Sequence, residues 1–318
     1  MHVSFVIPLY HCLDLTQACV ASLQATLPAG LAHEIILVDD GSTDGTRAWL
    51  ATLRPPFRVV LNERNLGYAG ANNRGAALAT GRILALLNND LVLKPHWLEP
   101  MLAAHRRLGT RAGLIGNVQR AARTGAVDHS GIFINLKGKP EHDTSLPPRW
   151  MRRLRPVRPV AALTGACMLL ARDLWTQLGG FDENFRNGGE DVDLCFRARA
   201  AGRVNAIALR SVIDHHISAS VGRKKNDEHN SRRLALRWRP ELEQLALRAW
   251  CWDFLRREWS GTRDPSECAT ALEMLLYAAN LRRTPPAFAR DQMHAAMNRE
   301  FERWAQLLDG PAAGPSAG

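Results

Sequence analysis

Three carboxylates stand close together in the segment Ile35–Thr46, which reads IILVDDGSTDGT. An apolar run ends in Asp39 and Asp40, and a turn containing glycine then leads to Asp44. Capping of the following helix explains one carboxylate, because a helix start needs acceptors for its free N–H groups. Three carboxylates within six residues instead indicate a ligand site. Ligands of open α/β sheets bind at the carboxyl ends of the strands.

A second polar group, Asn88–Asp90, follows the apolar run Ile83–Leu87. A carboxylate beside amide oxygens suits a hard cation that keeps some waters and bridges phosphates, meaning Mg²⁺ or Mn²⁺. The alternative is an Asn-rich turn before a helix that begins near Pro95. We expect this strand to run parallel to the strand before Asp39 and to lie next to it in the sheet.

A third group, Glu190 and Asp191, follows two glycines and begins a helical pattern. Adjacent carboxylates at a helix start can cap the helix, or they can present a general base to a hydroxyl nucleophile. Further along the chain, His215 and His216 could supply a metal ligand, although a single histidine is usually structural.

A parallel sheet would bring these groups together. Short apolar runs alternate with helical patterns over the first 120 residues, as expected for βαβ units with helices on both faces of a sheet. The predicted strands are Val3–Ile7, Glu34–Val38, Phe57–Leu61, Arg82–Leu87 and Ala112–Ile115. The predicted helices are Leu13–Leu27, Gly45–Leu53, Ala69–Ala79, Pro95–Leu108 and Glu190–Ala201.

The rest of the chain differs in composition. The segment Lys137–Pro159 is rich in proline and carries seven basic and two acidic residues, which predicts an exposed, mobile loop. From Arg223 onward the pattern is helical, and Arg232–Trp259 holds four tryptophans among arginines. That stretch fits a basic amphipathic helix at a membrane interface, or a helical subdomain packed by its tryptophans, which we favour.

The overall composition narrows the class of protein. The 318 residues are 46% hydrophobic and carry a net charge of +10, typical of a globular protein that binds anions. Because the alternating aromatic and basic pattern of a single-strand-binding surface is missing, we expect no nucleic-acid partner. A strand beginning at Val3 leads us to expect no signal peptide. Six cysteines without a C-x-x-C pair favour the reducing cytoplasm.

Taken in order, these motifs resemble those of the family 2 inverting glycosyltransferases, which have the glycosyltransferase A fold. The resemblance covers about residues 3–221 and rests on Val6–Tyr10, Val38–Thr46, Asn65–Asn73, Leu87–Asp90, Thr164–Cys167, Gly179–Glu183 and Gly189–Asp191. It implies an α/β fold with a Rossmann-like, mostly parallel sheet flanked by helices, to which the C-terminal pattern adds a helical extension. It leans towards bacterial surface-polysaccharide enzymes, including rhamnosyltransferases.

The resemblance also implies roles for single residues on the donor side. A pyrimidine base would lie between Pro8 and Tyr10, and Asp40 would accept its N3–H. Uracil and thymine fit equally, so the donor would be a UDP- or dTDP-sugar. Asp90, with His215 as a further ligand, would hold Mn²⁺ or Mg²⁺ against the donor diphosphate. The other expected nucleotide-binding residues are Asp44, Gly70, Asn73 and Asn89.

On the acceptor side, Asp191 would deprotonate the attacking hydroxyl of a glycan or lipid-linked saccharide, and Glu190 would orient the acceptor or the base. One in-line displacement would then invert the anomeric configuration. The basic segment Lys137–Pro159 would attract an anionic acceptor. We therefore expect a cytoplasmic, metal-dependent enzyme, at the inner face of the membrane if it makes peripheral lipid contact. The donor sugar, the linkage and the oligomeric state stay open.

Two departures and one alternative complete the sequence argument. The usual Asp-x-Asp of the family reads Asn88–Asp90 here, so the cation has one carboxylate, and His11 stands where the family often has Asn. A dinucleotide oxidoreductase or a P-loop NTPase would need a glycine-rich phosphate loop that the sequence lacks. A non-catalytic nucleotide- or carbohydrate-binding relative is the alternative, and the pair Glu190 and Asp191 favours the enzyme.

These patterns predict three parts of the chain. A nucleotide-sugar-dependent glycosyltransferase domain would span residues 1–221, with a donor half at 1–120 and an acceptor half at 121–221. A helical subdomain at 222–309 and a flexible tail at 310–318 would follow.

Overall fold

The computed structural model describes residues 2–216, 226–257 and 265–310. The chain divides into two compact units. The first, which we call the sheet unit, comprises Met1–Ile132 and His142–Asn226, and the second, the helical unit, comprises Phe133–Glu141 and Asp227–Gly318. The expected boundary between residues 221 and 222, and nearly all of the expected tail, lie outside the described residues.

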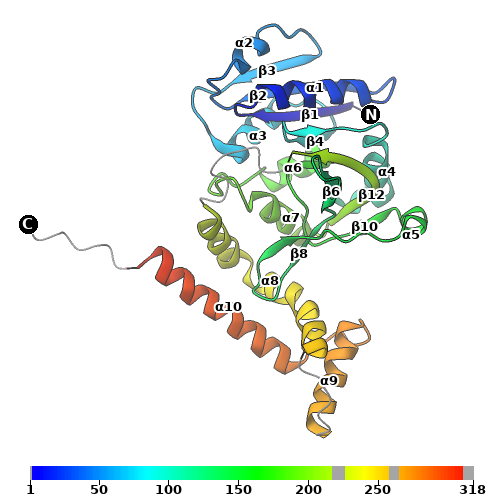
Figure 1. Ribbon diagram of the computed structural model, residues 1–318, viewed down its shortest axis with the longest axis vertical. Coiled ribbons are helices and arrows are strands. Elements are labelled where there is room, and N and C mark those ends of the chain that lie inside the picture. Colours follow the sequence, from blue (N-terminus) through cyan, green and yellow to red (C-terminus); the bar gives the residue numbers. More distant parts are fainter. Residues whose placement is uncertain (1, 217–225, 258–264, 311–318) are drawn as a thin grey trace, which may run out of the picture. The chain divides into compact units, whose positions relative to one another are not determined.

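The sheet unit is built on a ten-stranded sheet with the order β10-β12-β6-β11-β4-β1-β2-β3, which β5 and β7 extend by pairing with β12 and β6 (Figure 1). Strands β1 to β4 are mutually parallel, whereas β11 runs antiparallel to both β4 and β6. The strands are β1 His2–Leu9, β2 Ala32–Asp39, β3 Phe57–Leu61, β4 Ile83–Leu87, β5 Leu91–Val92, β6 Ala112–Ala121, β7 Val127–His129, β10 Val157–Pro159, β11 Cys167–Ala171 and β12 Val204–His215.

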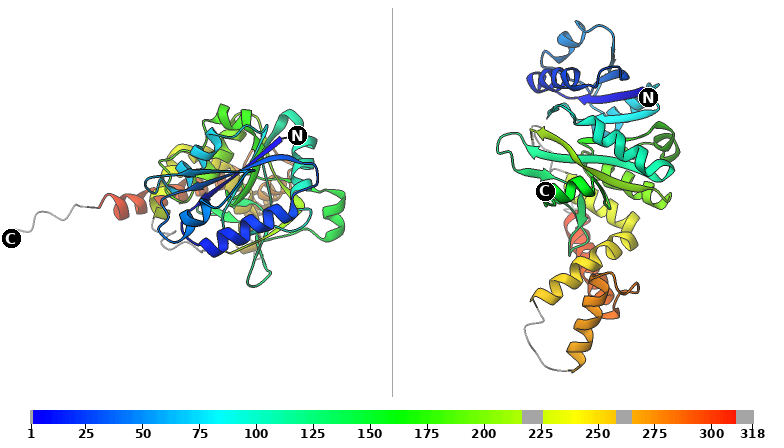
Figure 2. Two further views of the ribbon diagram at one scale, coloured as in Figure 1. Left: turned by 90° about the horizontal axis from the view of Figure 1, so that it is seen from above. Right: turned by 90° about the vertical axis from the view of Figure 1, so that its right-hand side faces the viewer.

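Helices cover both faces of this sheet. Side chains of a strand alternate between its two faces, so neighbouring residues of β1 pack on different helices. Phe5 and Ile7 of β1 belong to one buried cluster with residues of α1 and α4. Val6 faces α3, where a Cβ on Gly75 would lie 2.5 Å from its Cγ1. Figure 2 shows α1 running along the strands at the N-terminal end of the sheet. The helices are α1 Leu13–Thr26, α2 Thr46–Leu50, α3 Gly67–Ala77, α4 Leu98–Leu108, α5 Arg149–Leu154, α6 Arg172–Leu178 and α7 Glu190–Ala200.

The expected α/β class, the mostly parallel N-terminal sheet, its flanking helices and the helical C-terminal region are confirmed, but three details were wrong. Strand β1 lies between β4 and β2, so the strands that precede Asp90 and Asp39 are not neighbours. The strand β12 was not predicted. The segment Lys137–Pro159 contains α5, β10 and β9 (Pro140–His142) instead of a continuous loop.

The helical unit contains α8 (Asp227–Arg257), α9 (Pro265–Ala278) and α10 (Ala287–Leu308), together with the segment Phe133–Glu141. Helix α8 is kinked at Trp238, two residues before Pro240. Trp304 is 1% exposed, and Lys139 pairs with Glu300 at 3.2 Å, which ties the inserted segment to α10. Within the described residues, no helix is long and apolar enough to span a bilayer.

Glu34 of β2 joins β1, β3 and the segment between α3 and β4. Its Oε1 accepts hydrogen bonds from the Ser4 hydroxyl at 2.6 Å and from the N–H and hydroxyl of Thr80, both at 2.7 Å. Its Oε2 accepts one from Arg58 at 2.8 Å. Burial opposes ionisation of Glu34, but these hydrogen bonds outweigh it and lower the pKa to about 2.

Replacing Glu34 with Gln should therefore lower the free energy of unfolding at neutral pH by roughly 1–3 kcal/mol. The folded-state pKa lies below the ordinary value of 4.5, so the stabilisation is complete above that pH and is lost as the pH falls towards 2. Urea unfolding at several pH values should show the difference between wild type and Glu34→Gln narrowing under acid. A difference independent of pH would contradict this account, and Glu63→Gln, at an exposed residue, is the control.

Candidate active site

A cavity of about 370 Å³ opens in the sheet unit where β1 and β4 end. Parallel strands β1 and β4 bring their carboxyl ends to one edge of the sheet, and the loop before β11 and the start of α7 complete the wall. The residues that line it are Pro8, Leu9, Tyr10, Asp40, Asn65, Gly67, Tyr68, Ala71, Asn88, Asn89, Asp90, Thr164, Gly165, Ala166, Asn187, Gly188, Glu190 and Asp191. Three polar motifs that are far apart in sequence therefore meet here.

Asp40 organises the part of the wall that follows β2. Its Oδ1 accepts hydrogen bonds from the Asn62 amide and from the Leu66 N–H, both at 2.8 Å. Its Oδ2 accepts one from the Gly67 N–H at 2.9 Å. The carboxylate is almost fully buried, yet Oδ2 retains a lone pair beyond the one that Gly67 uses. Asp40 can thus accept one further hydrogen bond from a ligand in the cavity.

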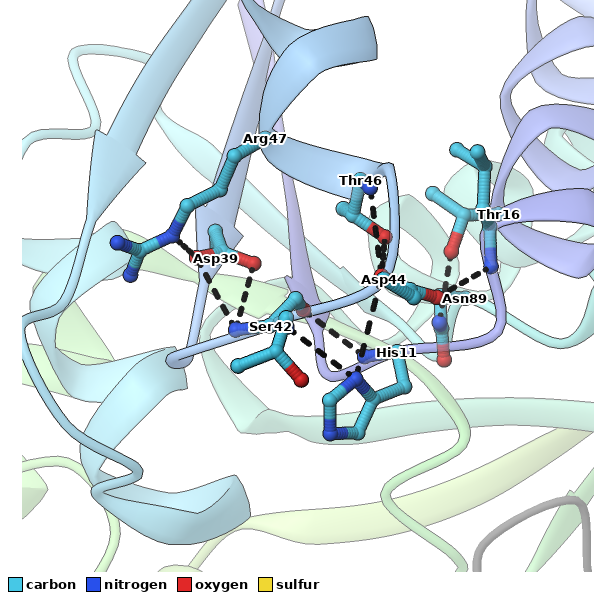
Figure 3. A network of polar contacts seen from close by, with 10 residues as sticks. His11, Thr16, Asp39, Ser42, Asp44, Thr46, Arg47 and Asn89 are labelled. Atoms are coloured by element: carbon cyan, nitrogen blue, oxygen red, sulfur yellow. Dashed lines mark hydrogen bonds and ion pairs between the residues drawn. The ribbon is translucent and has the colours of Figure 1, made fainter.

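The two neighbouring carboxylates hold the backbone instead (Figure 3). Asp39 accepts hydrogen bonds from Arg47 at 2.7 Å and from the Ser42 N–H at 3.2 Å. Asp44 accepts hydrogen bonds from the Thr46 hydroxyl at 2.5 Å and the Leu13 N–H at 3.2 Å. Neither side chain lines the cavity: Asp39 holds the turn after β2, and Asp44 holds the starts of α1 and α2.

The residue at position 11 has a physical explanation in the backbone. His11 has a φ of 57°, in the left-handed region, at the turn between β1 and α1. Asn and His are both enriched in that region among residues other than glycine, so His can take a position where the family often has Asn. Its N–H donates to the Ser42 hydroxyl at 2.8 Å, which holds this turn against the turn that follows β2 (Figure 3).

Asp90 and His215 meet at the opposite end of the cavity wall. The Nε2 atom of His215 lies 3.3 Å from Asp90 Oδ1, and its Nδ1 atom lies 3.8 Å from Asp128 Oδ2. Strand β12 brings His215 there, and the His216 N–H donates to the Asp90 carbonyl at 2.9 Å. Burial lowers the pKa of His215, but the contacts with Asp128 and Asp90 outweigh it and raise the pKa to about 9.

Several buried polar atoms at this end of the site are incompletely satisfied. Asn88 Oδ1 has no hydrogen-bond partner, and Asp90 Oδ1 and the two ring nitrogens of His215 have only the ion-pair contacts given above. Oxygen and imidazole donors of this kind fit a divalent cation that also takes phosphate oxygens and water. In the part of the chain that the structure describes, no cluster of three His, Cys, Asp or Glu side chains could hold a metal by itself. A cation could use Nε2 of His215 only after its proton leaves.

The part of the wall beside α7 depends on the peptide groups of Gly165. The Gly165 N–H donates to Asp191 Oδ2 at 2.8 Å, and its carbonyl accepts a hydrogen bond from the Tyr68 hydroxyl at 2.7 Å. Burial, then the negative charges of Glu190 and Asp191, raises the pKa of Tyr68 well above its ordinary value, so the hydroxyl stays a donor. Glu190 is 5% exposed and accepts the Gly188 N–H at 2.7 Å, which fixes the turn into α7.

The expected site residues thus fall into three groups. Seven of them line the cavity: Pro8, Tyr10, Asp40, Asn89, Asp90, Glu190 and Asp191. His215 contacts Asp90 from behind. The remaining three do not line it. Asp44 accepts the Leu13 N–H at the start of α1, Gly70 packs on Leu66, and Asn73 exchanges hydrogen bonds with Phe181. Their roles in nucleotide binding stay predictions.

Tyr68 and Asn187 are two of the lining residues to which the sequence argument gave no role. Tyr68 and Asn187 are linked across the cavity, because the Tyr68 N–H donates to Asn187 Oδ1 at 3.1 Å. Tyr68 lies within the segment Asn65–Asn73 that carries the resemblance, but its partners are about 100 residues away in sequence. Only the fold reveals them.

The fold thus places a polar cavity at the carboxyl ends of parallel strands, where open α/β sheets bind their ligands. The family model described as Glycosyl transferase family 2 matches residues 4–173. The chain therefore belongs to glycosyl transferase family 2.

Curated relatives are consistent with that assignment. Uncharacterized protein y4gI of Sinorhizobium fredii is 30% identical over 267 residues, which cover 81% of this chain and 27% of the relative. The O-antigen biosynthesis protein RfbC of Myxococcus xanthus is 32% identical over 69% of this chain and 17% of its own length. An N-acetylglucosaminyl-diphospho-decaprenol L-rhamnosyltransferase of Mycobacterium tuberculosis is 32% identical over 59% of this chain and 68% of the relative. The chain thus spans about a quarter or less of the first two relatives.

Solved structures share the fold. GalNAc-T7 with UDP, GalNAc and Mn²⁺ superposes with a TM-score of 0.60 at 17% identity, over 86% of this chain and 54% of that one. TarS 1–349 of S. aureus in complex with UDP-GlcNAc gives a TM-score of 0.59 at 14% identity, over 97% and 91% of the two chains. Both similarities support the glycosyltransferase A fold.

The close approach at Gly165 makes a testable prediction. A Cβ on Gly165 would lie 2.8 Å from the Tyr68 hydroxyl oxygen, so Gly165→Ala should lower the free energy of unfolding by about 1–3 kcal/mol. In a Tyr68→Phe background the nearest atoms would be ring carbons at 3.2 Å, and the same substitution should cost less. Urea unfolding of the four proteins of this double-mutant cycle measures the coupling. Equal costs in both backgrounds would contradict the proposed contact.

Proposed function

We propose that the chain transfers a sugar from a UDP- or dTDP-sugar to a hydroxyl of a glycan or lipid-linked acceptor, with inversion, in the synthesis of a cell-surface polysaccharide. The observation that carries the proposal is the meeting of Asp40, Asp90 and Asp191 in one cavity of a family 2 chain. The O-antigen and rhamnosyltransferase relatives support the pathway and a hexosyl or deoxyhexosyl donor. A cytoplasmic location belongs to the same proposal.

On the donor side, Pro8 and Tyr10 flank the pyrimidine, and Asp40 accepts the N3–H of uracil or thymine. Tyr10 is 47% exposed beside the cavity, so its ring is accessible to a base. The Asp40 carboxylate is held by three hydrogen bonds, so it is oriented before the nucleotide arrives. Asn89 donates to Thr16 at 2.8 Å and keeps its amide oxygen for the ligand.

The diphosphate would bind beside Asp90. Asn88, Asp90 and His215 would hold Mn²⁺ or Mg²⁺ there through the buried side-chain oxygens of Asn88 and Asp90 and a ring nitrogen of His215. When bound, the cation neutralises charge that develops on the departing nucleoside diphosphate. Because one carboxylate and one histidine make an incomplete protein ligand set, the donor phosphates must supply further oxygens.

On the acceptor side, Asp191 acts as the general base. Its Oδ1 and Oδ2 each accept one backbone hydrogen bond, from Val192 and Gly165, which leaves a lone pair on each oxygen for an acceptor hydroxyl. As the hydroxyl oxygen bonds to the anomeric carbon, the bond to the diphosphate breaks on the opposite face and the hydroxyl proton passes to Asp191. Glu190 holds the turn that presents Asp191.

The substitution Asp191→Asn tests the proposal. The amide is nearly isosteric but cannot take the proton, so turnover should fall about 10²–10⁴-fold. A screen of UDP- and dTDP-sugars for donor hydrolysis identifies the substrate, and calorimetry with the matching nucleoside diphosphate should show unchanged affinity in the variant.

Asp173→Asn is the matched control, because Asp173 is an exposed acid at the second position of α6, as Asp191 is of α7. Normal turnover in Asp191→Asn would move the base elsewhere. A wild-type protein that binds the nucleotide but turns over no donor would be a non-catalytic binding relative.

A further inference from the structure

Helix α5 carries an unusual set of exposed side chains for a soluble surface. It is six residues long, reads RWMRRL, and lies in the sheet unit just before the edge strand β10 (Figure 1). Trp150 is 61% exposed, Leu154 is 72% exposed and Met151 is 37% exposed. None of its residues is buried, so these apolar side chains do not serve the core of the unit.

The charged residues of α5 and of the segments directly flanking it, within residues 144–156, are all basic. Residues 144–156 contain four arginines and no acidic residue. Arg149, Arg153 and Arg155 are exposed, and none of them has an ion pair with an acidic side chain of residues 2–216, 226–257 or 265–310. Arg158 differs, because it pairs with Asp143 at 3.2 Å and donates to Ser130, and so belongs to the fold.

The C-terminal helices, whose tryptophans could alternatively have formed a membrane surface, are less suitable. Trp250 stacks on Phe254 at 5.8 Å between ring centroids and meets Phe288 edge-on at 5.9 Å, so it packs within the helical unit. Trp259 lies outside the described residues. Among the described tryptophans of both regions, Trp150 of α5 is 61% exposed, against 40% for Trp252 of α8.

We propose that α5 docks the protein on an anionic lipid bilayer, with Trp150 and Leu154 in the headgroup region and Arg149, Arg153 and Arg155 on lipid phosphates. Tryptophan favours the interface because its ring is apolar and its N–H is polar. Arginine matches phosphate oxygens with several donors and keeps its stem against apolar surface. The inference goes beyond the proposed function and does not depend on it.

Cosedimentation of the full chain with vesicles tests the proposal. The protein should bind vesicles of equal parts phosphatidylcholine and phosphatidylglycerol, and bind pure phosphatidylcholine much more weakly. Replacing Arg149, Arg153 and Arg155 with Ser should weaken binding to the anionic vesicles roughly 100-fold, since each basic residue at such a surface changes partitioning about fivefold. The variant Trp150→Ser with Leu154→Ser should also weaken it, and added salt should weaken the wild type.

The matched control replaces Arg106, Arg107 and Arg111 with Ser, an equal change of charge at exposed residues near the end of α4. This control should bind as the wild type does. Equal loss in both triple variants would mean that net charge alone drives binding, and would overturn the proposal. Failure of the wild type to bind the anionic vesicles would also overturn it. So would a dimer of the wild type, seen by ultracentrifugation without lipid, that the α5 variants do not form.

Discussion

One loop, Thr164–Ala166, fixes the relative positions of the donor and acceptor sides of the cavity. The Gly165 N–H holds Asp191, and the Gly165 carbonyl receives the Tyr68 hydroxyl from α3. The next carbonyl, of Ala166, accepts the Asn88 N–H at 2.8 Å, two residues before Asp90 in the chain. The loop can do this because β11, which follows it, pairs with β4. The pairing of β4 with β11 therefore fixes the positions of the proposed base, the proposed metal ligand and the turn at the start of α3 relative to one another.

The carboxylates in this site accept hydrogen bonds from backbone N–H groups and also face the cavity. Asp40 gathers the N–H groups of Leu66 and Gly67 at the start of α3. Asp191 is held by two N–H groups, and Glu190 accepts the Gly188 N–H on its own turn. Such contacts fix each side chain before substrate arrives, which reduces the entropy lost on binding and on reaching the transition state. Asn88 Oδ1 is the exception, because it is buried without a partner beside Asp90, where we propose the cation.

The sequence was sufficient to predict which motifs meet, because strand ends of a parallel sheet share one edge. It was insufficient to separate Asp40 from Asp39 and Asp44, since all three follow the same strand and only the path of the backbone decides which one faces the cavity. Strand β12 was missed because Arg210 and Ser211 interrupt its apolar pattern at an irregularity in the pairing with β6. Tyr68 and Asn187 depend on contacts between distant segments, which no local pattern reveals.

A crystal structure of the chain with Mn²⁺ and UDP tests the central claim most directly. The account predicts the uracil between Pro8 and Tyr10 with its N3–H on Asp40, the diphosphate and Mn²⁺ together at Asp90, and the Asp191 carboxylate open on the far side. A nucleotide bound outside this cavity, or a metal ion without contact to Asp90, would contradict it.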